Sequence, residues 1–148
     1  MEAARYEQLM EDLIEGPYWI IDILPEQVPA NAPGQYFAVD EYFRKPERLA
    51  GLHGTFAELL LRVNCYHDMA VSFDDCETWE INPDPEDFVR NLIELSGFRY
   101  MRAVFGEEGA MAEIQPDDTY ITLYDPDEKL LELVRELAGA SGLFVWRP

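Results

Sequence analysis

The chain has 148 residues, the length of one ordinary domain, and 48% of them are hydrophobic, which is enough for a packed core and argues against disorder. The formal net charge is −19, from 30 acidic against 11 basic residues, and such a charge disfavours binding to nucleic acid or to anionic membranes. The N-terminal residues contain no basic segment followed by an apolar run, and no apolar stretch is long enough to cross a bilayer. We therefore expect a single domain over residues 1–148, without a secretory signal and in the cytoplasm.

The first third of the chain predicts a helix, a strand and a loop. Apolar side chains recur three and four positions apart over residues 3–14, which is typical of one face of a helix. Residues 18–24 are rich in β-branched and aromatic side chains and predict a strand. Three prolines and a closing Gly34 exclude regular structure over residues 25–34, and we interpret this segment as a stiff connector.

The middle of the chain predicts a strand, a helix and then two strands that form a hairpin. Residues 35–43 have strand composition, and Pro46 is placed to begin a helix. The spacing of Thr55 and Glu58 matches a capping box, so the helix is expected to restart at Thr55. Residues 66–73 and 77–81 predict two strands joined by an acidic turn.

Two acidic segments of similar composition, Asp84-Pro85-Glu86-Asp87 and Asp125-Pro126-Asp127-Glu128, predict the starts of two further helices. Each start is occupied by its own carboxylates, which disfavours phosphate or nucleotide binding there. Strands are predicted over residues 98–105, 110–115, 119–124 and 143–146, with a turn over 106–109.

The order of these elements predicts an α+β fold with about four helices on a mixed, largely antiparallel sheet. Residues 35–105 follow the order strand-helix-strand-strand-helix-strand, which is that of a ferredoxin-like βαββαβ unit. Extra strands and a C-terminal helix and strand would extend it. Residues 78–102 and 119–147 share the order strand, Asp-Pro start, helix, glycine, strand, which is explained either by duplication or by similar capping.

Cys65, His67 and Cys76 are the first candidates for chemistry. On a strand, Cys65 and His67 would share a face, which allows either joint metal ligation or joint burial. The spacing of these residues lacks the four-ligand pattern of zinc sites, so we expect no metal and no cofactor. A Cys65–Cys76 disulfide disagrees with a cytoplasmic location. The carboxylates beside Cys76 oppose formation of a nucleophilic thiolate.

The acidic hairpin of Asp74, Asp75, Glu77 and Glu80, with Trp79 among them, is the second candidate. Paired carboxylates serve in glycoside hydrolysis and in calcium binding, but the calcium-loop pattern is absent, and a solvated hairpin tip explains the cluster equally well.

Aromatic side chains on the predicted strands are the third candidate, because a sheet face left uncovered by helices would make them a binding surface. Arg102 lies on such a strand and is expected to pair with carboxylates. The leading hypothesis is a non-enzymatic protein-binding or regulatory module, such as an inhibitor or immunity-type protein for a basic partner. The alternative is a small enzyme or small-molecule-binding domain with a pocket between sheet and helices. The aromatic surface also allows a homodimer.

Overall fold

The computed structural model describes residues 2–31, 34–106 and 109–148. Within these residues it confirms an α+β fold, with five helices and a seven-stranded, all-antiparallel sheet. The helices are α1 (Glu2–Ile14), α2 (Tyr36–Phe43), α3 (Pro46–Asn64), α4 (Pro85–Ile93) and α5 (Glu128–Ala140). The strands are β1 (Tyr18–Asp22), β2 (Met69–Ser72), β3 (Glu80–Ile81), β4 (Met101–Phe105), β5 (Met111–Ile114), β6 (Tyr120–Tyr124) and β7 (Phe144–Trp146).

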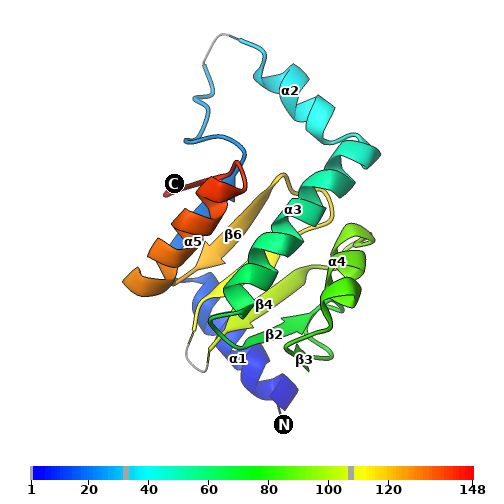
Figure 1. Cartoon of the computed structure of the whole chain (residues 1–148), viewed down its shortest axis with the longest axis vertical. Helices are drawn as coiled ribbons and strands as arrows, with labels where there is room; N and C mark the ends of the chain where they lie inside the picture. The colour runs from blue at the N-terminus through cyan, green and yellow to red at the C-terminus, as the bar shows by residue number, and fades with distance from the viewer. Residues whose placement is uncertain (1, 32–33, 107–108) are drawn as a thin grey trace.

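The sheet has the strand order β3-β2-β4-β5-β6-β1-β7. Helices α3, α4 and α5 cover one face, and α1 lies against the other (Figure 1). Successive side chains of a strand point to opposite faces, so Trp19 and Ile21 of β1 join the larger core under α3, α4 and α5. Phe56 of α3 and Phe88 of α4 are fully buried in that core.

The second predicted strand is wrong: residues 36–43 form α2. Helix α2 and the described parts of residues 23–35, together called the arch, project beyond the end of the sheet (Figure 1). None of the α2 side chains is buried. The aromatic composition favours a strand, but a strand needs a neighbour to pair with, and this segment lies beyond the end of the sheet and pairs with none of its strands (Figure 1). The bond from Arg44 Nε to Asp40 Oδ2, 2.9 Å long, instead spans one helical turn.

The loss of that strand removes the predicted ferredoxin-like unit, and the sheet is antiparallel throughout its described strands rather than mixed. Helix α3 also runs without interruption. Thr55 Oγ1 donates to the Gly51 carbonyl one turn earlier, as a residue inside a helix does, and it caps no new start.

Two other boundaries near the predicted site residues and helix starts differ from the predicted ones. Strand β2 begins only at Met69, so His67 lies in the turn after α3. Helix α5 is capped by Asp127, whose carboxylate accepts the Leu130 N–H at 2.7 Å, whereas Asp125 lies outside the helix with a φ of 50°. The start of α4 is as predicted, because Asp84 accepts the Asp87 N–H. The predicted turn over 106–109 and the predicted loop over 25–34 include positions 107–108 and 32–33, which lie outside the described residues.

The two similar segments have the same arrangement in the sheet. Strands β3 and β4, connected through α4, lie on either side of β2, and strands β6 and β7, connected through α5, lie on either side of β1. Duplication stays a hypothesis that fits this arrangement. None of the helices in the described part of the chain is both long and apolar enough to span a membrane.

Candidate functional site

The sheet face that carries α1 is only partly covered. Apolar side chains of α1, including Tyr6 and Leu13, pack on Ala70, Val104 and Met111. The strand register places a mainly polar row directly beside this apolar row. Across the sheet it consists of Ser72, Arg102, Glu113, Thr122, Ile20 and Trp146. Beyond it, Asp22 stands between Tyr120 and Phe144 on the neighbouring strands.

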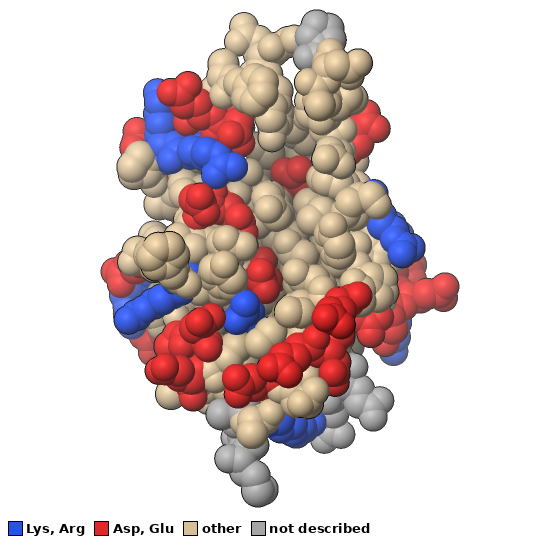
Figure 2. Space-filling view, turned by 180° about the vertical axis from the view of Figure 1, so that it is seen from behind, with Lys and Arg blue, Asp and Glu red and all other residues tan. Residues whose placement is uncertain are grey.

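The uncovered end of this face is hollowed into a cleft of about 600 Å³, which we call the open-face cleft. Strands β5, β6, β1 and β7 contribute its floor, Ile14 at the end of α1 bounds it on one side, and the arch contributes a further wall. Figure 2 shows this face, with the hollow in the upper half of the molecule and acidic side chains in its walls.

Four carboxylates line the cleft, and they differ in whether a cation neutralises them. Asp40 bonds to Arg44 at 2.9 Å, and Glu113 bonds to Arg102 at 3.2 Å. Asp22 Oδ1 instead accepts the Ile23 N–H at 2.7 Å, and no basic side chain among the described residues forms an ion pair with it. Burial raises the pKa of Asp22, and this effect outweighs the stabilising hydrogen bond from Ile23. Glu26, at the rim, is exposed and also lacks an ion pair in the described structure.

Aromatic side chains form much of the remaining lining. Tyr18 and Tyr124 lie on paired strands with ring centroids 5.8 Å apart. Burial, with a smaller effect of Glu113, raises the pKa of Tyr124 to about 12, and burial also raises the pKa of Tyr120. The indole Nε1 of Trp146 is buried and has no partner in hydrogen-bond geometry, although its N–H still lowers the pKa of Asp22 slightly.

The β5–β6 turn connects the arch to the sheet. Arg44, the residue that follows α2, donates from Nη1 to the Asp117 carbonyl at 2.6 Å, and His53 Nε2 of α3 lies 2.8 Å from the Asp118 carbonyl oxygen. Burial raises the pKa of the Asp118 carboxyl to about 6, and Asp117 and Glu113 act in the same direction. This carboxyl therefore changes charge near pH 6.

The predicted acidic hairpin and Arg102 come together beside the cleft. Arg102 donates to Asp75 Oδ1 at 3.2 Å and contacts Cys76 Sγ at 3.3 Å, in addition to its bond with Glu113. Burial raises the pKa of the Cys76 thiol, and the neighbouring Asp75 adds to the rise, so Arg102 does not produce a ready thiolate. The cluster is therefore a hydrogen-bonded network at the edge of the site, in which Arg102, Glu113 and Cys76 are buried and Asp75 is exposed.

Asp74 organises the hairpin turn itself. Its carboxylate accepts hydrogen bonds from Ser72 Oγ, the Thr78 N–H and the Thr78 hydroxyl. Burial alone would raise the pKa of Asp74, but these hydrogen bonds lower it. Glu77 and Glu80 are exposed, whereas Trp79 packs under α1, 4.8 Å from the Tyr6 ring.

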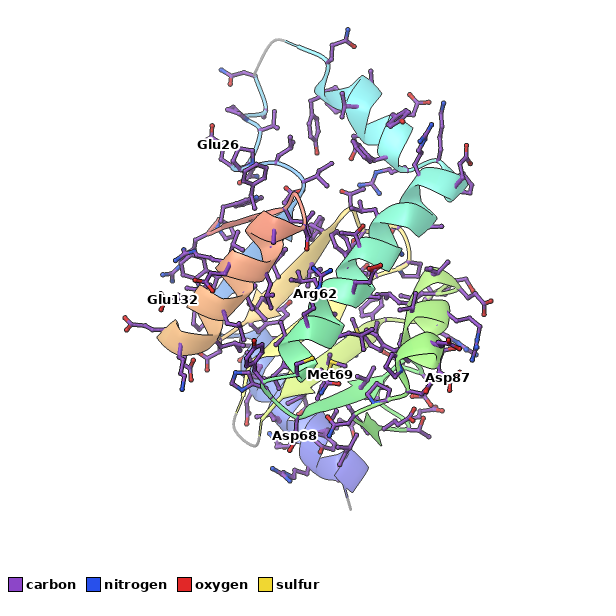
Figure 3. All side chains as sticks on the ribbon, in the orientation of Figure 1. Glu26, Arg62, Asp68, Met69, Asp87 and Glu132 are labelled. Atoms are coloured by element: carbon purple, nitrogen blue, oxygen red, sulfur yellow. The ribbon has the colours of Figure 1, made fainter. Side chains whose placement is uncertain are left out.

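Cys65 and His67 do not join this cluster. They precede β2, whereas the acidic turn follows it, so the two groups lie at opposite ends of the strand. Figure 3 shows Asp68, next to His67 in the chain, at the end of the molecule opposite Glu26 of the arch. Cys65 is exposed, and its Sγ contacts the Leu61 carbonyl at 3.5 Å. Among the described residues, no three His, Cys, Asp or Glu side chains lie together in a group that could hold a metal ion.

The sequence does not identify Asp22, Glu113 and Trp146 as a site, although it predicts that an uncovered sheet face would expose aromatic side chains. A signal was present: Asp22 and Glu113 are single acids within otherwise apolar strands. Acids at such positions mark the polar face of a strand, but the sequence does not show that this face stays uncovered.

Comparison of the chain with known proteins found no matching family model, no matching curated protein and no matching solved structure.

Proposed function

We propose that this protein is a non-enzymatic binding module that engages a basic protein partner through the open-face cleft, as an inhibitor or regulator would. The observation that carries the proposal is the chemistry of the cleft, in which carboxylates and aromatic rings outnumber the single basic residue, Arg44. Aromatic surface with acidic groups suits a cationic partner, because the rings supply contact area and the acids supply attraction. The net charge of −19 would speed the encounter with such a partner at low salt.

The test compares two variants of equal net charge. Asp22→Asn with Glu26→Gln removes the two cleft carboxylates that have no basic partner in the described structure. Glu132→Gln with Glu136→Gln removes two exposed carboxylates from α5, on the opposite face of the sheet. The immobilised wild type is used to retain basic proteins from the native lysate, and salt releases them. Each released protein is purified and then titrated calorimetrically with the wild type and the two variants.

We expect the α5 variant to bind within about twofold of the wild type and the cleft variant to bind at least about tenfold more weakly, since about 1.4 kcal/mol corresponds to a factor of ten. Equal weakening of both variants would show that net charge alone is responsible, and equal binding by all three proteins would show that the two cleft carboxylates do not contribute. Either result would remove the cleft from the proposal. Failure to find any salt-sensitive basic partner would reject the proposed function.

The alternative function is small-molecule binding, or a small enzyme, in the same cleft. The favouring observation is its volume of about 600 Å³, within the range of about 300–1,000 Å³ common for small-ligand pockets. Native mass spectrometry of the protein purified without denaturation tests this function. A bound mass that the double cleft variant lacks would support the alternative, and a bare chain mass after incubation with a metabolite extract would count against it.

A further inference from the structure

We propose that the occupant of the open-face cleft is the guanidinium group of an arginine side chain presented by the partner, held between Asp22 and the aromatic lining. This inference rests on the proposed function, and it specifies the chemistry that the cleft recognises. Asp22 differs from the other acids on the cleft floor and arch wall in its partners. Asp40 and Glu113 each bond to an arginine of this chain, whereas Asp22 has no such partner among the described residues.

Asp22 is partly buried, and burial makes the lack of a cationic partner unfavourable for its carboxylate. A carboxylate that is removed from water without a cation is destabilised, which is the reason for the raised pKa of Asp22. An incoming cation relieves the destabilisation and gains a charge-assisted hydrogen bond in a site partly shielded from solvent. The floor of the cleft is therefore more suited to a cation than the many exposed acids elsewhere on the surface.

The aromatic lining favours a planar cation. Tyr120 stands directly across from Asp22 on β6, and Trp146 lies diagonally from it on β7. A guanidinium group can stack on such rings while it bonds to a carboxylate, and it loses less hydration than an ammonium group when it enters. An ammonium group fits the charge of the cleft but makes poorer use of the rings.

The same sheet face already holds one guanidinium group in this manner. Arg102 lies 4.9 Å from the Tyr100 ring centroid and bonds to Glu113 and Asp75 at 3.2 Å each. Asp22 and Tyr120 provide a carboxylate and an aromatic ring in the same combination, two strands away from Glu113. None of the arginines in the described residues forms an ion pair with Asp22. The geometry of Arg102 is thus an internal example of the contact that we infer for the partner.

The test uses three small probes: ethylguanidinium, the smaller cation ethylammonium, and the neutral ethylurea, which has the same size and shape as ethylguanidinium. Each is titrated at millimolar concentration into the ¹⁵N-labelled full chain, and the three indole N–H signals are followed by NMR. Trp146 lines the cleft, whereas Trp79 packs under α1 and Trp19 faces the α5 side, so the last two signals serve as internal controls.

We expect ethylguanidinium to shift the Trp146 signal in a saturable manner while the signals of Trp79 and Trp19 stay in place. Ethylammonium should bind several-fold more weakly, and Asp22→Asn should weaken ethylguanidinium binding about tenfold, the size typical of losing one charge-assisted contact. Equal shifts with ethylurea, or shifts of all three indole signals, would overturn the inference. The probe comparison on the wild type needs no variant, so the result stands even if Asp22→Asn fails to fold.

Failure of the inference and failure of the proposed function are distinguishable. Selective ethylguanidinium binding without any basic protein partner would leave the cleft chemistry in place and reject the proposed function. Cleft-dependent binding of a basic protein without a selective response to ethylguanidinium would keep the function and reject arginine as the recognised group.

Discussion

The buried ion pair between Arg102 and Glu113 gives the most specific stability prediction. Both side chains are only 11% exposed, and their Nε–Oε2 separation is 3.2 Å. Methionine in place of Arg102 keeps an unbranched apolar stem but leaves the Glu113 carboxylate buried without a cation. Removal of one partner of a buried pair costs about 3–5 kcal/mol. We expect Arg102→Met to lower the free energy of unfolding by about 3 kcal/mol, the lower end of this range, because Glu113 lines the cleft and can recover some hydration.

A double-mutant cycle separates this pair from the other contacts of Arg102. Glu113→Gln leaves Arg102 bonded to Asp75 and Cys76, so we expect a smaller loss, of about 1–2 kcal/mol. The double variant should lose less stability than the sum of the single variants, with a coupling energy of about 1–2 kcal/mol. Asp75→Asn is the matched control, since Asp75 is 66% exposed and an exposed ion pair contributes at most about 1 kcal/mol.

The assay is urea unfolding at pH 7, followed by far-ultraviolet circular dichroism, with the midpoint and slope compared across the four proteins of the cycle. An unchanged slope indicates that the substitutions alter stability rather than the denatured state. A loss below about 1 kcal/mol for Arg102→Met, or additive single effects within about 0.5 kcal/mol, would refute the argument that burial makes this pair important.

Three further predictions concern titration, thiol reactivity and helix capping. The pKa of Asp118 is raised to about 6 in the folded protein. The folded state therefore binds more protons than the unfolded state between about pH 4 and 6. As a result, the contribution of Asp118 to the free energy of unfolding decreases as pH rises through that window. Asp118→Asn should flatten this dependence and gain about 1 kcal/mol at pH 7 after allowance for solvent screening, and unchanged pH dependence in thermal unfolding would contradict it. Iodoacetamide at pH 8 should modify exposed Cys65 at least about tenfold faster than Cys76, because Cys76 is buried and its pKa is raised. Peptide mass spectrometry measures the two rates, and equal rates would disagree with the burial of Cys76. Asp127→Ala should cost about 1 kcal/mol in urea unfolding, because the α5 cap is lost, and an effect below about 0.3 kcal/mol would indicate that another group caps this helix.

Local patterns in the sequence were sufficient for most of the secondary structure. Helix α4 begins where the Asp84-Pro85 pair predicts, because a carboxylate cap and a proline act on adjacent backbone groups. Strands β1 and β6 lie within the segments whose β-branched and aromatic residues predict strands, and α1 follows from its apolar face. These signals act within a few residues, so they can be recognised without knowledge of the fold.

The sequence by itself thus determined an acidic α+β protein with well-marked helix starts, and the tertiary structure decided the strand pairing and the site. Residues 36–43 have strand composition but form α2, because they lie beyond the end of the sheet and pair with none of its strands (Figure 1). Asp22, Glu113 and Trp146 meet only through the register of strands that are distant in sequence. Whether their face is covered depends on where α1 and the arch pack, which is a property of the whole chain rather than of any segment.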